Sequence, residues 1–134
     1  SFRRSPSPRI RYRKLSRLAD DTSILLSTLA AMSHPEDSEA IHNAFLRASS
    51  YLETRTRARF RFCEGKECGL DRVEKALDRW AEATPVLKRD LLDACSQSVL
   101  ADGNVSSQEA ELIRAIADAI GCPIPPFVRA APLT

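Results

Sequence analysis

The sequence predicts an all-α fold, a single compact bundle of about five helices, from three observations. Apolar residues recur at three- and four-residue spacing through most of the chain, as on one face of a helix. There are only four glycines, and β-branched residues are few beside Ala, Leu, Glu and Arg, which favours helix. A length of 134 residues, with 43% apolar and 28% charged residues, is typical of one globular domain.

The first two helices are expected on either side of a break at residues 33–35. Acidic and hydroxyl residues at 20–22 suit a helix N-terminus. The stripe that follows them at helical spacing consists of Ile24, Leu25, Thr28, Leu29 and Met32. Pro35 and the two acids after it are expected to open the second helix, because proline is tolerated in a first turn. The apolar stripe of that helix consists of Ile41, Ala44, Phe45, Ala48 and Leu52.

The last three helices have clearer boundaries. An apolar stripe over residues 73–81 predicts the third helix. The stripe of the fourth helix consists of Leu87, Leu91, Ala94, Cys95 and Val99, and that of the fifth of Leu112, Ile113, Ile116, Ala117 and Ile120. The pair Thr84–Pro85 suits the N-cap and first turn of the fourth. Ser106, with Glu109 three residues later, predicts a capping box at the start of the fifth, and Gly121 a C-cap at its end. Most connections are short, so neighbouring helices are expected to run antiparallel.

Charge is unevenly distributed along the chain. Residues 1–66 carry 13 Lys and Arg against 7 Asp and Glu, a net of +6. Residues 67–134 carry 7 against 11, a net of −4. The excess of basic residues lies in an N-terminal arm or linker, residues 1–19, and in residues 54–69. Such a chain can place its basic half against an anionic membrane surface, nucleic acid or an acidic partner.

Both basic segments alternate with a period of two. For residues 9–13 this allows a short edge strand or an extended, solvated arm. Residues 54–62 could pair with the arm as a strand, or could be a helix end that frays into a loop. An irregular or short extended segment is preferred, which leaves a short β-like basic segment open within the all-α fold.

The second basic segment also contains Phe60 and Phe62 among its arginines. Aromatic side chains beside a basic groove stack on bases in nucleic-acid-binding proteins. A loop with two apolar anchors and solvated arginines explains the same residues and is preferred, because the net charge is only +2. A membrane-facing basic patch remains open. The candidate contacts to an anionic surface are Arg55, Arg57, Arg59 and Arg61.

Catalytic motifs are missing from the sequence. A zincin site needs two histidines one helical turn apart and a glutamate base, and the two histidines present, His34 and His42, do not form it. No nucleophile-elbow, P-loop or dinucleotide motif occurs either. We therefore expect no catalytic residue and no cofactor in this chain.

The cysteines allow several interpretations. Cys63 and Cys68 have a spacing that disulfides and metal sites both use, but a structural zinc site usually needs four N or S ligands. Cys95 lies on an apolar helix face and Cys122 follows a helix end, so spacing does not bring all four together. Free thiols are preferred, and a Cys63–Cys68 disulfide and a metal site remain open.

Residues 102–109 match the second half of a calcium-binding EF-hand loop. The first half does not match, because Ser98 and Leu100 stand where the first and third ligands should be. Asp102 and Glu109 are the weak candidate metal ligands. A tight turn between two helices, closed by the capping box, explains the same residues and is preferred.

Several patterns in residues 73–128 occur together in one family. They are the stripe Ala76, Leu77 and Trp80, LKRDLLDAC at 87–95, ADG-x-V-x-x-x-EAELIRAIAD at 101–118, and CPIPP at 122–126. In this combination the segment resembles the C-terminal part of bacterial HtpX-like membrane zinc metallopeptidases. The ADG-x-V-x-x-x-E core is also similar to TerB, a helical module associated with tellurite resistance. The resemblance implies a TerB-like domain over residues 20–127 and a C-terminal tail over 128–134.

The resemblance also implies a function. The parent would be a zinc peptidase of the bacterial inner membrane, with its zinc in a catalytic part outside this chain. This domain would be a soluble, cytoplasmic-facing accessory or regulatory domain without catalysis of its own. Its partner would be the peptidase domain of the same parent or another protein. A start without Met and without a signal-peptide apolar region is expected for a fragment or a processed chain.

TerB-like modules have an acidic surface suited to metal or partner binding. Only Asp102, Glu109 and Glu111 could be carried over to this sequence for that role. One alternative to the accessory function is therefore a metal-responsive stress module. Another, based on the basic arm and Arg55–Arg61, is a module that binds an anionic membrane surface or nucleic acid, with nucleic acid the less favoured of the two.

Overall fold

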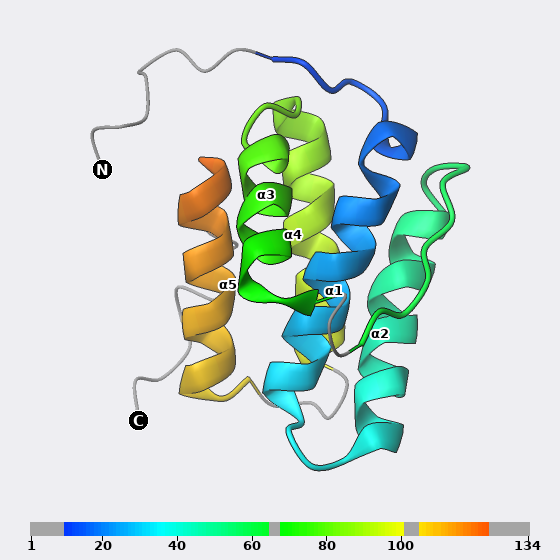
Figure 1. The fold of residues 1–134 in the computed structure, drawn as a ribbon, viewed down its shortest axis with the longest axis vertical. Helices are drawn as coiled ribbons and strands as arrows, with labels where there is room; N and C mark the ends of the chain where they lie inside the picture. Colours follow the sequence, from blue (N-terminus) through cyan, green and yellow to red (C-terminus); the bar gives the residue numbers. More distant parts are fainter. Residues whose placement is uncertain (1–9, 65–67, 101–104, 124–134) are drawn as a thin grey trace.

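The structure, a computed structural model, describes residues 10–64, 68–100 and 105–123. Five α-helices form a bundle in these residues, which confirms the predicted all-α class (Figure 1). A short 3-10 helix, η1 (Leu15–Leu18), precedes them. The helices are α1 (Ala19–Ser33), α2 (Ser38–Glu53), α3 (Leu70–Trp80), α4 (Pro85–Val99) and α5 (Ser107–Ile120).

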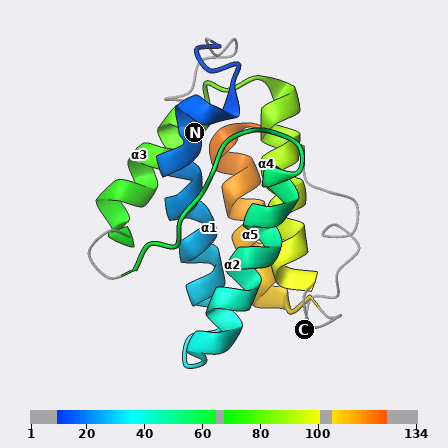
Figure 2. The same ribbon diagram turned by 90° about the vertical axis from the view of Figure 1, so that its right-hand side faces the viewer.

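Helix α1 lies in the middle of the bundle and contacts the other four helices (Figures 1 and 2). It is therefore buried on several faces, and Leu26, which the expected stripe omitted, has no exposed surface. Met32, which the stripe included, is 45% exposed. A one-sided pattern could not describe α1, because a helix surrounded by neighbours has no single inner face.

The inner faces of the last three helices meet in the core, as their stripes predicted. Trp80 is fully buried there, and its indole nitrogen donates a hydrogen bond to the Thr22 hydroxyl at 3.2 Å. That hydroxyl donates to the Leu18 carbonyl at 2.7 Å. The chain of two bonds satisfies the polar atoms of a large aromatic side chain inside an apolar core.

Three of the helix ends are those that the sequence predicts. The Thr84 hydroxyl accepts from the Leu87 N–H at 3.3 Å. Ser106 and Glu109 form the complete capping box at the start of α5. Gly121 ends α5 in the left-handed conformation at φ 74°, which a residue with a Cβ adopts only at a cost.

The start of α2 was predicted wrongly. Pro35 does not open the helix but lies in the turn before it, and α2 begins at Ser38. The Asp37 carboxylate accepts from the Ala40 N–H at 3.0 Å, so an acidic N-cap fixes the first turn.

Residues 54–64, here called the crossover segment, run back along the bundle from the end of α2 toward α3 (Figure 2). Consecutive helices α2 and α3 consequently point the same way, whereas the other consecutive pairs are antiparallel, as expected (Figure 1). Within the described residues the crossover segment has no strand partner. It is the irregular extended segment that the sequence favoured, and it does not pair with the described part of the arm, residues 10–19.

Helix α1 replaces the missing strand partner of the crossover segment. The Arg61 N–H donates to the Ser23 hydroxyl at 3.1 Å, and the Cys63 N–H donates to the Ser27 hydroxyl at 2.9 Å. Two residues of extended chain span about 6.6 Å, and one helical turn of four residues spans about 6 Å. Hydroxyls four residues apart on a helix can therefore satisfy alternate N–H groups of an extended segment.

The N-terminal arm pairs instead with the turn between α3 and α4. Arg11 and Tyr12 both donate their N–H groups to the Glu82 carbonyl, at 2.7 and 3.1 Å. Tyr12 forms a single parallel β-bridge with Ala83. The short β-like segment left open by the sequence is thus reduced to one bridge in the part of the chain described.

Replacing Ser27 by Ala should lower the free energy of unfolding by about 1–3 kcal/mol, because the buried Cys63 N–H would lose its acceptor. Chemical denaturation followed by far-UV circular dichroism measures this. Ser50→Ala, at an exposed position of α2, is the matched control and should change stability by less than about 0.5 kcal/mol. Equal losses in the two variants would contradict the role given to Ser27.

Candidate functional site

Asp102 lies outside the described residues, and Glu109 is used as a helix cap. Its carboxylate accepts from the Ser106 N–H at 3.0 Å, while the Ser106 hydroxyl accepts from the Glu109 N–H at 3.1 Å. Glu111 is exposed and pairs with Arg114 at 3.4 Å. To bind a metal, the Glu109 carboxylate would have to give up its hydrogen bond with the Ser106 N–H. Among the residues that the structure describes, no three His, Cys, Asp or Glu side chains are close enough to hold a metal ion.

All four cysteines are free thiols in the structure. Cys95 is fully buried in α4, and burial raises the pKa of its thiol to about 12. Cys68 donates through its thiol to the Cys63 carbonyl at 3.3 Å. Cys122 is half-buried after α5, and burial raises the pKa of its thiol as well. A thiol with a raised pKa stays protonated at neutral pH and is a poor nucleophile. Cys95 is therefore an unreactive residue of the core.

The two histidines have structural surroundings. His42 lies on α2, with its Nδ1 2.9 Å from the Ser38 carbonyl and its ring 4.4 Å from that of Phe62. Phe62 also makes an edge contact with Phe45 at 5.5 Å. His34 follows the end of α1, where its N–H donates to the Ala30 carbonyl. The contact between the His42 and Phe62 rings helps to fix the crossover segment on α2.

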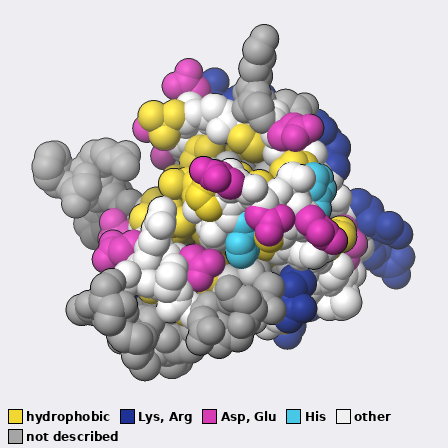
Figure 3. Space-filling view, turned by 90° about the horizontal axis from the view of Figure 1, so that it is seen from below, with side chains coloured by type: hydrophobic (Ala, Val, Ile, Leu, Met, Phe, Trp, Pro, Cys, Tyr) yellow, Lys and Arg dark blue, Asp and Glu magenta, His cyan; other side chains and the backbone are white. Residues whose placement is uncertain are grey.

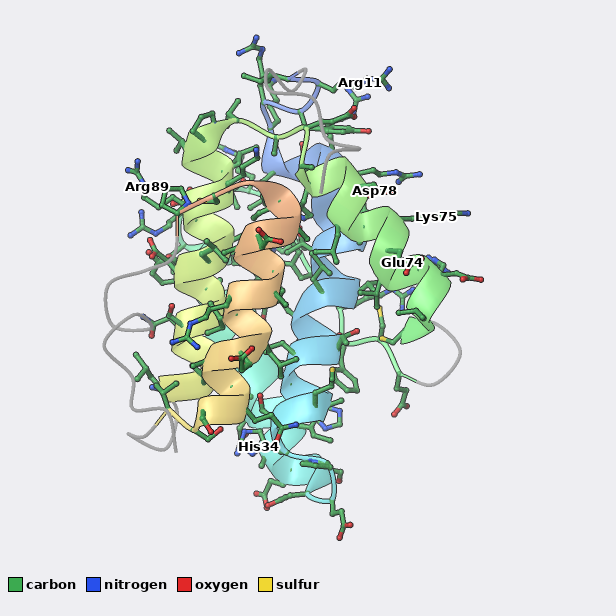
Figure 4. The ribbon with its side chains drawn as sticks, turned by 90° about the vertical axis from the view of Figure 1, so that its left-hand side faces the viewer. Arg11, His34, Glu74, Lys75, Asp78 and Arg89 are labelled. Carbon is green, nitrogen blue, oxygen red and sulfur yellow. The ribbon has the colours of Figure 1, made fainter. Side chains whose placement is uncertain are left out.

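An apolar groove of about 160 Å³ opens between α1, α3 and α5. Figure 4 shows α1 lying behind α3 and α5, so that α1 provides the floor of the groove. Met32 on that floor is 45% exposed. The predicted helix stripes include all of the lining residues except Ala115, but they do not show that some of these side chains reach the surface together. The lining residues are Leu25, Thr28, Leu29, Met32, Val73, Leu77, Leu112, Ala115 and Ile116.

Acidic side chains flank the apolar groove. At 100° per residue, Glu74 and Asp78 follow Val73 and Leu77 on the outer side of α3 (Figure 4). Glu111 and Asp118 lie beside the groove on the exposed side of α5 in the same way. From below, acidic side chains lie around the hydrophobic side chains that reach the surface, and Lys and Arg gather mostly toward the right-hand edge (Figure 3).

Arg72 and Arg79 lie on the side of α3 that faces α1, whereas Lys75 points outward beside Glu74 and Asp78 (Figure 4). The Arg79 guanidinium lies 3.4 Å from the carboxylate of Asp21 on α1. Burial raises the pKa of Asp21, and Arg79 opposes that shift. Arg72 and Arg79 are thus separated from the groove, and Lys75 is the base of α3 that lies beside its acids.

A second depression, here called the basic cleft, lies at the end of the bundle where α2 ends and α4 begins. It has a volume of about 460 Å³ and is lined by cationic side chains from both basic segments of the sequence. Leu15, Ala58 and Leu87 form its apolar wall, and Asp90 contributes a carboxylate. The cationic residues are Arg13 and Lys14 from the arm and Arg55 and Arg57 from the crossover segment.

The four predicted arginines therefore do not act as one group. Arg55 and Arg57 line the basic cleft, and Arg59 is exposed outside it. Arg61 lines a smaller pocket of about 70 Å³ beside Asp20. Period-two spacing suggested a single arginine face, but the chain turns at residues 54–57 before it becomes extended.

The side chain of Arg55 is held on one side of the cleft. Its guanidinium carbon lies 4.5 Å from the centroid of the Tyr51 ring, a cation–π contact. The Tyr51 hydroxyl donates to Asp93 at 3.3 Å. Burial raises the pKa of Asp90, and the nearby Arg55 partly offsets this.

Together these features define a small all-α domain whose described residues form a central helix, an apolar groove and a basic cleft. The chain belongs to the TerB family, because the family model described as "Tellurite resistance protein TerB" matches residues 24–131. Searches of curated proteins and of solved structures gave no match. The TerB part of the expected resemblance is thus confirmed, and no relative supports the HtpX-like part. The described helices include none with the length and apolarity that crossing a bilayer requires.

Proposed function

We propose that this chain is a non-catalytic interaction domain that docks an apolar, basic-flanked helical segment of a membrane-bound zinc metallopeptidase, its parent protein. The single observation that carries the docking role is the apolar groove between α1, α3 and α5. The peptidase as parent rests on the resemblance of residues 73–128 to the HtpX-like family.

The shape of the groove favours a helix as its occupant. Three helices bound it, and an amphipathic helix places side chains into such a groove at i, i+3 and i+4 positions. Met32 on its floor and Ala115 on α5 are exposed, so a docked helix would cover apolar surface that now faces water. Burial of that surface is the favourable term for association.

The flanking charges favour an occupant with basic residues beside its apolar stripe. Glu74 and Asp78 on one side, and Glu111 and Asp118 on the other, would face those residues. Charge complementarity of this kind selects a partner and speeds its association. Segments on the cytoplasmic side of inner-membrane proteins carry an excess of Lys and Arg, which suits a membrane-bound parent.

Ala115→Arg and Met32→Lys should each weaken binding of this chain to the cytoplasmic segments of the parent peptidase by about tenfold or more. Each places a long charged side chain on the apolar surface that the partner helix would cover, so docking would have to bury or displace that charge. Isothermal titration calorimetry of the whole chain against those segments measures the effect. Both positions are exposed, so the fold should be retained.

Leu46→Lys is the matched control, because Leu46 is 56% exposed on α2 and lies outside the groove. It should leave the dissociation constant unchanged. Unchanged binding by Ala115→Arg would rule out the groove as the docking surface. A parent reading frame with neither a zincin motif nor membrane spans would show the peptidase assignment to be wrong.

A further inference from the structure

We propose that the basic cleft is a binding site for a small phosphate-bearing ligand, separate from the apolar groove and beyond the docking function. The observation behind it is the convergence of two cationic segments that are about forty residues apart in the sequence. Arg13 and Lys14 come from the arm, and Arg55 and Arg57 from the start of the crossover segment.

The charge within the cleft is largely uncompensated. Four cationic side chains line it, against the single carboxylate of Asp90. Among the described residues, Arg13, Lys14 and Arg57 form no ion pair. Like charges held near each other repel, so a bound anion would relieve an unfavourable interaction as well as form new contacts.

Backbone contacts hold the two sides of the cleft in place. On the arm side, the Thr84 N–H donates to the Tyr12 carbonyl at 3.1 Å, and Leu15 is buried. On the crossover side, Ala58 is buried, and its N–H donates to the Thr56 hydroxyl at 3.3 Å. The cationic side chains therefore extend from anchored positions, which lowers the entropic cost of binding.

The lining indicates the chemical class of the ligand. Guanidinium groups match the geometry of phosphate oxygens and can donate two parallel hydrogen bonds to them. Beside the cations, Leu15, Ala58 and Leu87 offer an apolar wall for a less polar part of the same molecule. The cleft volume of about 460 Å³ lies within the range of small-molecule sites, roughly 300–1,000 Å³. A nucleotide and a phosphomonoester lipid headgroup share this chemistry.

Calorimetric titration of the whole chain with pyrophosphate and with adenosine diphosphate tests a soluble source of the phosphate. Co-sedimentation with phosphatidylcholine vesicles, with and without phosphatidic acid, tests a lipid source. We expect saturable binding in one of these two experiments. Binding of the soluble probes assigns the site to a free ligand, and binding only to phosphatidic acid vesicles assigns it to a headgroup.

Three variants separate the cleft from general attraction to a basic protein. Arg57→Ala should weaken binding about tenfold or more, because a charge-assisted hydrogen bond to phosphate is lost. Asp90→Asn should tighten binding, because the one carboxylate in the cleft repels the ligand. Arg59→Ala removes the same charge from the same segment outside the cleft and should leave binding unchanged.

Circular dichroism of each variant checks that the fold is retained. Equal weakening by Arg57→Ala and Arg59→Ala would overturn the proposal, since charge alone would then explain binding. So would the absence of binding to every probe at millimolar concentration, or tighter binding to single-stranded RNA than to any of them. Ala115→Arg should leave phosphate binding intact, so failure of the docking function and failure of this site are distinguishable.

Discussion

Replacing Trp80 by Ala is expected to lower the free energy of unfolding by about 3–5 kcal/mol, the largest effect of any single substitution considered. Trp80 has no exposed surface, and its removal would leave a cavity among the surrounding helices. Domains are usually stable by only about 5–15 kcal/mol, so much of the total would be lost. Guanidinium denaturation of the variant and of the unmodified chain measures the difference.

Companion variants divide the effect of Trp80 into its parts. Thr22→Val keeps the volume but leaves the indole N–H without its acceptor, and should cost about 1–3 kcal/mol. Leu70→Ala, on the same helix as Trp80 but at a side chain that is 71% exposed, is the control. A loss for Trp80→Ala no larger than for Leu70→Ala would contradict the placement of Trp80 at the centre of the bundle.

The stability of the domain should fall at alkaline pH because of Cys95. An unfolded thiol ionises near its ordinary pKa of 9.0, whereas the buried thiol has a pKa of about 12. Between these two values the unfolded state binds fewer protons than the folded state, so rising pH favours unfolding. Between these two pKa values, the free energy of unfolding should fall by about 1.4 kcal/mol for each unit by which the pH rises.

Comparing the pH dependence of unfolding for Cys95→Ala and for the unmodified chain isolates this effect. The variant is expected to be less stable at neutral pH because of the lost side-chain volume, but its stability should fall less steeply at alkaline pH. Burial also raises the pKa of Tyr51, but that contribution is common to both proteins and cancels. Parallel curves for the two proteins above pH 9 would show that Cys95 ionises equally in both states.

Features that depend on neighbouring residues were predictable from the sequence. The capping box of Ser106 and Glu109, the N-cap of Thr84 and the left-handed Gly121 each involve contacts within a few residues. The same holds for the apolar stripes of α3 and α5. The start of α2 was missed because the sequence offers two local signals there, and the Asp37 cap prevails over Pro35 as an opening residue.

Contacts between distant segments were not predictable in the same way. No residue pattern showed that Ser23 and Ser27 would accept hydrogen bonds from the crossover segment, nearly forty residues further on. Alternating arginines indicated an extended chain but not which of them would share a surface. The apolar groove could not be predicted from the sequence for a related reason. An apolar stripe does not show which of its residues the neighbouring helices leave exposed.

The sequence by itself determined the all-α class, the number of helices and several of their ends, because helix periodicity and capping act over a few residues. The tertiary structure alone decided that α1 is central, that the arm meets the crossover segment at one cleft, and that three stripes leave a groove open. These outcomes depend on which surfaces bury each other, and burial is a property of the whole bundle, not of any one segment.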